Sequence, residues 1–219
     1  AMRSENWDVI PTSHGLRKPT TAWYLPLESR STKADRFQFL PCVKAELSAS
    51  RELLRTLGVV TLEEADIPRL CRALHDLAEH KDQAELETLR HYSALVHDLY
   101  EAIQVRLKAQ DGSDALEAIL NRPVPLLRGE QIACIALNEV GQLYVDDDPV
   151  RRRFLTGLDD AWFLPKRSHQ TYGELIDALR VLIGTDKVLR VSECPIALRF
   201  DPLEAGAALL DFVRHNYPG

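Results

Sequence analysis

Basic side chains gather at two neighbouring places in this sequence, and side chains of these types can bind phosphate. Three arginines follow the acidic run Asp146-Asp147-Asp148, and two more basic residues come shortly afterwards. A guanidinium group matches the geometry of phosphate oxygens. The structural alternative is that the acids favour the positive end of a helix dipole, while the arginines pair with them or face solvent. The candidates for a phosphate or partner contact are Arg151, Arg152, Arg153, Lys166 and Arg167.

Histidine stands beside aspartate twice, as His75-Asp76 and His97-Asp98. Some metal-dependent phosphohydrolases use such pairs as metal ligands, but no further histidine and aspartate stand in register with them here. His91 and His97 are six positions apart, which on a helix separates them by about 120° and prevents them from chelating one ion. We therefore expect surface or half-buried histidines and no metal site.

The sequence shows no loop or turn that commonly holds a cofactor or a nucleophile. The four cysteines lack the CxxC spacing of a zinc knuckle or redox pair, so we expect reduced thiols in the core. The glycines at 112, 129, 141 and 184 stand singly, and no Gly-x-Ser-x-Gly turn is present. We expect no cofactor, and nucleophilic catalysis has no support.

Arg69 and His75 are separated by five residues in a stretch with helical periodicity. This spacing resembles the Arg-x(4–6)-His pair of HEPN-type ribonucleases, whose fold is helical. The resemblance implies that His75 would act as general acid or base and that Arg69 would steady phosphate charge. Position 70 is leucine, where a polar residue is usual in that family. The alternative is that both side chains are simply solvated, and ribonuclease activity is kept as a rival hypothesis.

Composition places the chain among folded globular proteins. Its 219 residues are 45% hydrophobic and 27% charged, which is enough to bury a core of one large or two small domains. The net charge of −6 and the lack of aromatics among the basic residues argue against nucleic acid as a partner. No apolar run is long enough to span a membrane, and the start has no apolar signal region, so we expect a cytoplasmic location. Ala1 before the only methionine is typical of tag removal, and the chain is interpreted as a possible fragment.

The first half of the sequence predicts a hairpin followed by a helical block. Residues 9–12 and the run ending Trp23-Tyr24-Leu25-Pro26 are extended pieces around a turn at Gly15. Helical spacing, glycine at helix ends and capping boxes mark the block. Its four predicted helices are 48–57 before Gly58, one starting at Leu62 after the Thr61/Glu64 capping box, 82–109, and one capped by Ser113 that runs to Leu120.

The helix predicted from Asp82 to Ala109 carries the strongest pattern in the chain. We expect its apolar stripe to pack within the helical block under Leu70, Leu74 and Leu77. Spacings of three and four also suit a coiled-coil seam, so a homodimer is the alternative. The stripe consists of Leu86, Leu89, Tyr92, Val96, Leu99, Ile103 and Leu107.

After Arg122 the sequence changes to short apolar runs separated by glycine turns, which favours a β-meander over 123–127, 131–137 and 142–145. We predict helices after Asp148-Pro149, after a capping box of Thr171 and Glu174, and after Asp201-Pro202. Residues 188–191 and 196–200 are predicted strands. The expected class is a helix-rich α+β fold in two segments, 1–121 and 122–219, that can form one compact domain.

A short motif occurs twice. Trp23-Tyr24-Leu25-Pro26 returns as Trp162-Phe163-Leu164-Pro165, and each copy precedes a helix ending in glycine and a short apolar run. Two loosely repeated hairpin-plus-helix units around the helical block are therefore predicted. We expect Trp23 and Trp162 to be equivalent, largely buried anchors. Coincidence in a four-residue motif is the alternative.

The order of these elements resembles internal segments of the very large proteins that carry an Hsp90-like ATPase module, the sacsin-like group. The resemblance rests on Val9-Ile10-Pro11-Thr12 with Gly15 before the first motif, and on Tyr144-Val145 with the aspartates before the second. Asp111-Gly112-Ser113-Asp114 departs from the family's ATP-binding turn, so nucleotide binding is not implied. The resemblance implies a non-catalytic interaction or regulatory segment, whose partner is a protein or another domain of the parent chain.

Overall fold

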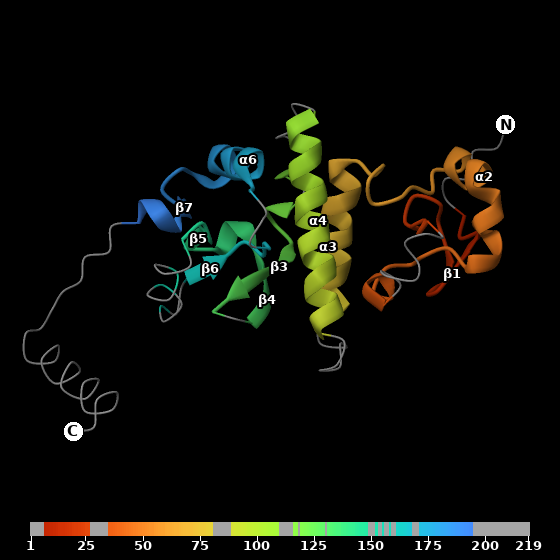
Figure 1. The fold of residues 1–219 in the computed structure, drawn as a ribbon, viewed down its shortest axis with the longest axis horizontal. Helices are drawn as coiled ribbons and strands as arrows, with labels where there is room; N and C mark the ends of the chain where they lie inside the picture. Colours follow the sequence, from red (N-terminus) through yellow and green to blue (C-terminus); the bar gives the residue numbers. More distant parts are fainter. Residues whose placement is uncertain are drawn as a thin grey trace, which may run out of the picture.

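The computed structural model describes residues 7–26, 35–80, 89–109, 116–117, 119–129, 131–148, 152, 155, 158, 161–167 and 171–194. Helices and strands both contribute, so the α+β class is confirmed. Figure 1 shows two central helices, α3 and α4, with a small N-terminal unit on one side and a sheet with one covering helix on the other. The predicted strand over 196–200, the helix after Asp201-Pro202 and the Ser113 cap lie outside the described residues.

The N-terminal unit begins with a hairpin of β1 (Ile10–Thr12) and β2 (Gly15–Arg17), which pair antiparallel. Gly15 has φ +86°, a left-handed conformation that glycine adopts without cost. A 3-10 turn, η1 (Ala45–Ser50), leads into α2 (Arg51–Thr56). Gly58 ends this helix at φ +95°, as the sequence predicts, and its N–H donates to the Arg55 carbonyl at 2.9 Å.

Helix α3 spans Ile67–His80 and starts later than predicted. The capping-box contacts do form, since Thr61 N–H donates to Glu64 at 3.3 Å and Glu64 N–H donates to Thr61 Oγ1 at 3.2 Å. They close only a turn, however, and Asp66 caps the helix by accepting from Arg69 N–H at 3.0 Å. A helix from Leu62 would hold Pro68 in its interior, whereas the observed start leaves Pro68 in the first turn, where proline is tolerated.

Helix α4 spans Leu89–Ala109, and the predicted residues 82–88 lie outside the described part of the chain. Its stripe is covered within one chain by α3, and α4 also contacts α6, as the sequence predicts for intramolecular packing. Tyr92 also donates its hydroxyl to the Leu77 carbonyl at 2.8 Å. Leu89 lies at the exposed end of the stripe and Leu107 is half-buried. The fully buried contacts include Leu70, Leu74, Leu77, Tyr92, Leu95, Val96, Leu99 and Ile103.

The second half forms a five-stranded sheet in the order β4-β3-β6-β5-β7. The β3–β4 hairpin matches the prediction, but the meander does not continue, because β5 pairs in parallel with β6 and β7. Helix α6 provides the crossover that joins parallel strands. The elements are β3 (Pro123–Arg128), β4 (Gln131–Ala136), η4 (Leu137–Glu139), β5 (Gln142–Val145), β6 (Ala161–Phe163), α6 (Gly173–Ile183), β7 (Val188–Arg190) and η5 (Val191–Glu193).

Strand β5 shows why the meander prediction was wrong. Leu143, Tyr144 and Val145 are all buried, on both faces of the strand. Leu143 and Val145 belong to the core beneath α6, while Tyr144 packs with Phe163 on the opposite face. A strand buried on both faces is typical of the middle of a parallel sheet rather than of a meander with one solvated face.

The N-terminal unit repeats the neighbour relations of this sheet. Strand β2 pairs antiparallel with β1, and Thr12 of β1 forms an antiparallel bridge with Val43. Trp23 then forms parallel bridges with Cys42 on one side and with Val60 on the other. The order β4, β3, β6, β5, β7 has the same sequence of orientations. Helices α2 and α6 each precede the last segment of their own unit.

The two tryptophans are nevertheless not equivalent in this arrangement. Val43 N–H donates to the Trp23 carbonyl at 2.8 Å, and Leu164 N–H donates to the Tyr144 carbonyl at 3.0 Å. Trp23 therefore occupies the place of Tyr144, while Trp162 lies one strand away in β6. Trp23 is 3% exposed and Trp162 only half-buried, so the prediction of two equivalent buried anchors is wrong. The two copies of the four-residue motif therefore lie on strands that hold different positions in their units.

Candidate functional site

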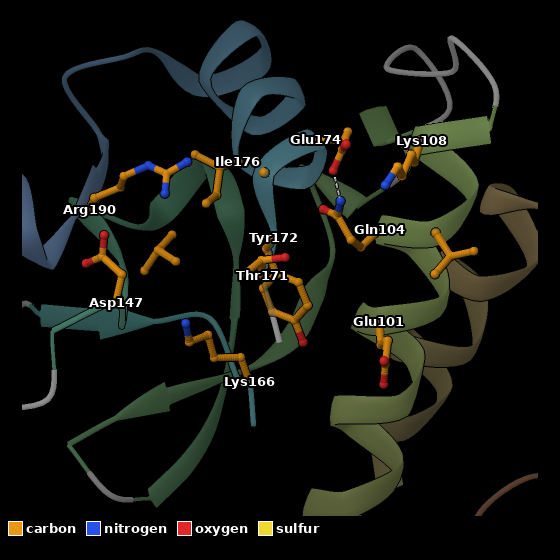
Figure 2. Close-up of a pocket in the computed structure, with 13 residues that line it drawn as sticks. Glu101, Gln104, Lys108, Asp147, Lys166, Thr171, Tyr172, Glu174, Ile176 and Arg190 are labelled. Carbon is orange, nitrogen blue, oxygen red and sulfur yellow. Dashed lines mark hydrogen bonds between the residues drawn. The ribbon is translucent and has the colours of Figure 1, made fainter. Parts of the chain in front are cut away.

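A cavity lies where the parallel strands β5, β6 and β7 end and α6 begins, a position where open α/β sheets commonly bind ligands. Helix α4 forms its opposite wall (Figure 2). Its volume is about 460 Å³, within the range of small-molecule pockets. The lining consists of Glu101, Gln104, Val105, Lys108, Val145, Asp147, Lys166, Thr171, Tyr172, Gly173, Glu174, Ile176 and Arg190.

The start of α6, at the top of this pocket, is capped by a residue of α4. Gln104 is 8% exposed, and its side-chain oxygen accepts from Leu175 N–H at 2.8 Å while its amide donates to Glu174. The predicted capping box of Thr171 and Glu174 is thus wrong, because the helix begins at Gly173 with no cap from its own side chains. The Glu174 carboxylate turns to Gln104 instead of reaching back to the helix start.

On the sheet side of the pocket, Asp147 is held in a fixed orientation. It accepts from Ser192 N–H at 2.8 Å and from the Ser192 hydroxyl at 2.5 Å. Burial acts to raise the pKa of Asp147, but these hydrogen bonds and the nearby Arg190 charge outweigh it and lower the pKa below its ordinary value. Arg190 itself lies 3.7 Å from Glu193. Among the described residues Lys166 has no salt-bridge partner.

The floor of the pocket is apolar with one fixed hydroxyl. Tyr172 is 2% exposed and donates its hydroxyl to the Pro165 carbonyl at 2.9 Å, and burial raises the pKa of this phenol. Ile176 and Val145 lie beside it, and both belong to the hydrophobic core. Charged side chains of both signs line the rest of the pocket, and these can bind ligand charge.

Arg69 and His75, the pair suggested by the ribonuclease resemblance, have different partners. The Arg69 guanidinium donates to the carbonyls of Gly58, Pro19 and Ala22 and lies over the Trp23 ring. Burial lowers the Arg69 pKa to about 10, mainly through desolvation. His75 is 6% exposed, and its Nδ1 lies 2.9 Å from the Pro123 carbonyl oxygen. One side chain faces the N-terminal unit and the other faces β3.

The basic patch predicted from sequence is divided in the structure. Arg152 pairs with Asp146 at 2.7 Å and lies over the Phe163 ring, and Arg167 pairs with Asp98 of α4 at 2.7 Å. Of the five residues, Lys166 lines the pocket. Arg151 and Arg153 lie outside the described residues.

His97 and Asp98 hold structural positions on α4. Asp98 joins Arg36 and Arg167, which come from segments far apart in the chain. Burial, followed by the Arg167 charge, lowers the pKa of His97. Within the described residues, no three histidine, cysteine or acidic side chains gather as a metal site would require.

Comparison with protein-family models, with curated proteins and with solved structures gave no match for this chain. In the part of the chain that the structure describes, no helix combines the length and apolar character needed to cross a membrane.

Most of the pocket residues were not selected by the sequence analysis. Lys166 belongs to the predicted basic patch and Asp147 to the acidic run before it, whereas Glu101 and Arg190 come from separate elements and form no local motif. Gln104 carried a signal that could have been used, since it directly follows Ile103 in the apolar stripe. A polar residue beside a buried stripe must find a partner, and here that partner is the start of α6.

Proposed function

We propose that this chain is a non-catalytic interaction segment of a larger protein with an Hsp90-like ATPase module, of the sacsin-like group, acting in the cytoplasm. Its partner is a protein or another domain of the same parent chain. The resemblance of its motifs motivates the parent class. The observation that carries the interaction role is an exposed apolar face on the N-terminal hairpin.

That face consists of Trp7, Val9 and Leu16, which are 67%, 42% and 57% exposed. Pro11 lies opposite Leu16 in the hairpin register, so these two side chains share a face, and Trp7 and Val9 precede β1. Ile10 points the other way and is 4% exposed in the core of the unit. Exposed large apolar side chains beside an edge strand are typical of contact surfaces.

The arginine and histidine side chains that could take part in catalysis hold structural contacts instead, which supports a binding role. Arg69, His75 and Arg167 each connect elements that are distant in sequence. The ribonuclease rival would need Arg69 and His75 to face one phosphate, and they contact different parts of the fold.

The test first identifies the reading frame that flanks this chain, and then measures binding of the chain to the flanking ATPase module by titration calorimetry. We expect binding that the double variant Trp7→Ser, Leu16→Ser weakens at least tenfold. The matched control is Leu53→Ser with Val181→Ser, two exposed apolar residues elsewhere that are 60% and 78% exposed. Equal weakening by both double variants would contradict the role of the hairpin.

The same protein is incubated with labelled RNA in parallel. Cleavage that disappears in His75→Ala would overturn the non-catalytic proposal in favour of the ribonuclease. Unchanged RNA is the expected result.

A further inference from the structure

The pocket at the start of α6 has opposite net charges on its two walls. Lys166, Arg190 and Asp147 stand on the sheet side, which carries one net positive charge at neutral pH. Glu101, Glu174 and Lys108 stand on the side of α4 and α6, which carries one net negative charge. Figure 2 shows the two groups facing each other across Thr171 and Tyr172.

Hydrogen bonding increases this asymmetry. Both carboxylate oxygens of Asp147 already accept from Ser192, so this acid offers less to a ligand than the neighbouring cations. Lys166 has no salt-bridge partner among the described residues, and the salt-bridge contact of Arg190 with Glu193 is long, at 3.7 Å. A ligand carboxylate therefore finds its donors on the sheet side.

The space between the walls is partly apolar and open. Val145, Ile176 and Val105 line it, and Val105 is 59% exposed. A Cβ atom added at Gly173 would meet no other atom within 4 Å. A volume of about 460 Å³ accommodates a short peptide with an aliphatic side chain.

We propose that this pocket binds a small zwitterion of the size of a dipeptide, with its carboxylate beside Lys166 and Arg190 and its ammonium group beside Glu101 and Glu174. A phosphate would meet three carboxylates in the same cavity, and a simple cation would meet three basic side chains. A ligand with both charges satisfies both walls. This binding does not depend on the partner proposed for the hairpin.

The probe is the dipeptide leucyl-leucine, compared by titration calorimetry with its N-acetylated and C-amidated forms. Each capped form loses one charge, and we expect each to bind about tenfold more weakly or worse, because a charge-assisted hydrogen bond is lost. Equal binding of all three forms, or stronger binding of inorganic phosphate than of the dipeptide, would overturn the proposal. Absence of any binding at millimolar dipeptide would also overturn it.

Variants assign the charges to the walls. Lys166→Gln should remove the difference between the dipeptide and its C-amide but keep the difference from the N-acetyl form. Glu101→Gln should do the reverse. Gly173→Trp should fill the pocket and abolish binding, while Gly141→Trp, at an exposed glycine that also has open space, should bind as the unaltered protein does. Unchanged binding in Gly173→Trp would show that the dipeptide binds elsewhere and would refute the site.

Discussion

Replacing Gln104 by leucine tests whether one side chain of α4 holds the start of α6 in place. The substitution keeps the side-chain volume close to the original but removes the oxygen that accepts from Leu175 N–H at 2.8 Å in a buried environment. It also removes the amide that donates to Glu174. The Leu175 N–H then has no acceptor, because a residue in the first turn of a helix has no carbonyl four positions back within the helix.

The expected cost follows from these two losses. Leaving a buried donor unsatisfied costs about 1–3 kcal/mol, and loss of a helix cap costs about 0.5–2 kcal/mol. Because both figures describe largely the same event, the two costs are not added. We therefore expect the free energy of unfolding to fall by about 2 kcal/mol in Gln104→Leu. For a chain of this size that change lowers the melting temperature by roughly 4–8 °C.

Urea unfolding followed by circular dichroism measures this difference, with Gln131→Leu at an exposed position of β4 as the matched control. Gln104→Glu adds a second readout, because it places a carboxylate against Glu174. Like charges raise the pKa of such a pair in the folded state, so the folded protein binds more protons and stability should increase as pH falls toward 4. A Gln104→Leu effect no larger than that of Gln131→Leu would refute the capping role.

Four other substitutions have effects that the structure specifies. Trp23→Ala should cost about 3–5 kcal/mol in urea unfolding and Trp162→Ala clearly less, because Trp162 is only half-buried; equal costs would contradict the difference in burial. Since burial and Arg167 lower the pKa of His97, the unfolded chain binds more protons and stability should fall as pH drops below about 6.5. His97→Gln should reduce that slope, and an unchanged slope would show that other groups cause it. Leu99→Glu should unfold the protein rather than split a dimer, because Leu99 is 0% exposed within one chain; light scattering that shows a dimer dissociating into folded monomers would contradict this.

Local sequence signals predicted local structure well in this protein. The hairpin at Gly15, the end of α2 at Gly58 and the stripe of α4 each depend on residues a few positions apart. The Thr61/Glu64 pattern shows the limit of such signals. Its hydrogen bonds form as predicted, but whether they open a helix was decided by Pro68, several residues away.

The pairing of strands could not be read from neighbouring residues. The place of β5 between β6 and β7 depends on α6 crossing over the sheet. The one local sign of it is the uninterrupted run of Leu143, Tyr144 and Val145, all of which the structure buries. The pocket depends on the same crossover, because α4, β5 and β7 come together only after the sheet has formed. Charged residues of the pocket such as Glu101 and Arg190 therefore look like ordinary surface positions in the sequence.

Helix α3 has a consequence for synthesis of the protein on the ribosome. Arg69, near its start, binds carbonyl groups of segments that have already been made, whereas His75 and the apolar face beside it pack on β3, which is translated later. A nascent chain from which α4 has emerged but β3 has not can thus complete the hairpin unit and the α3–α4 pair, yet it leaves one side of α3 uncovered. Exposed apolar surface of this kind attracts chaperones and other chains. A slow stretch of translation just before β3 would prolong that exposure, so codon choice in this part of the message should affect the yield of folded protein.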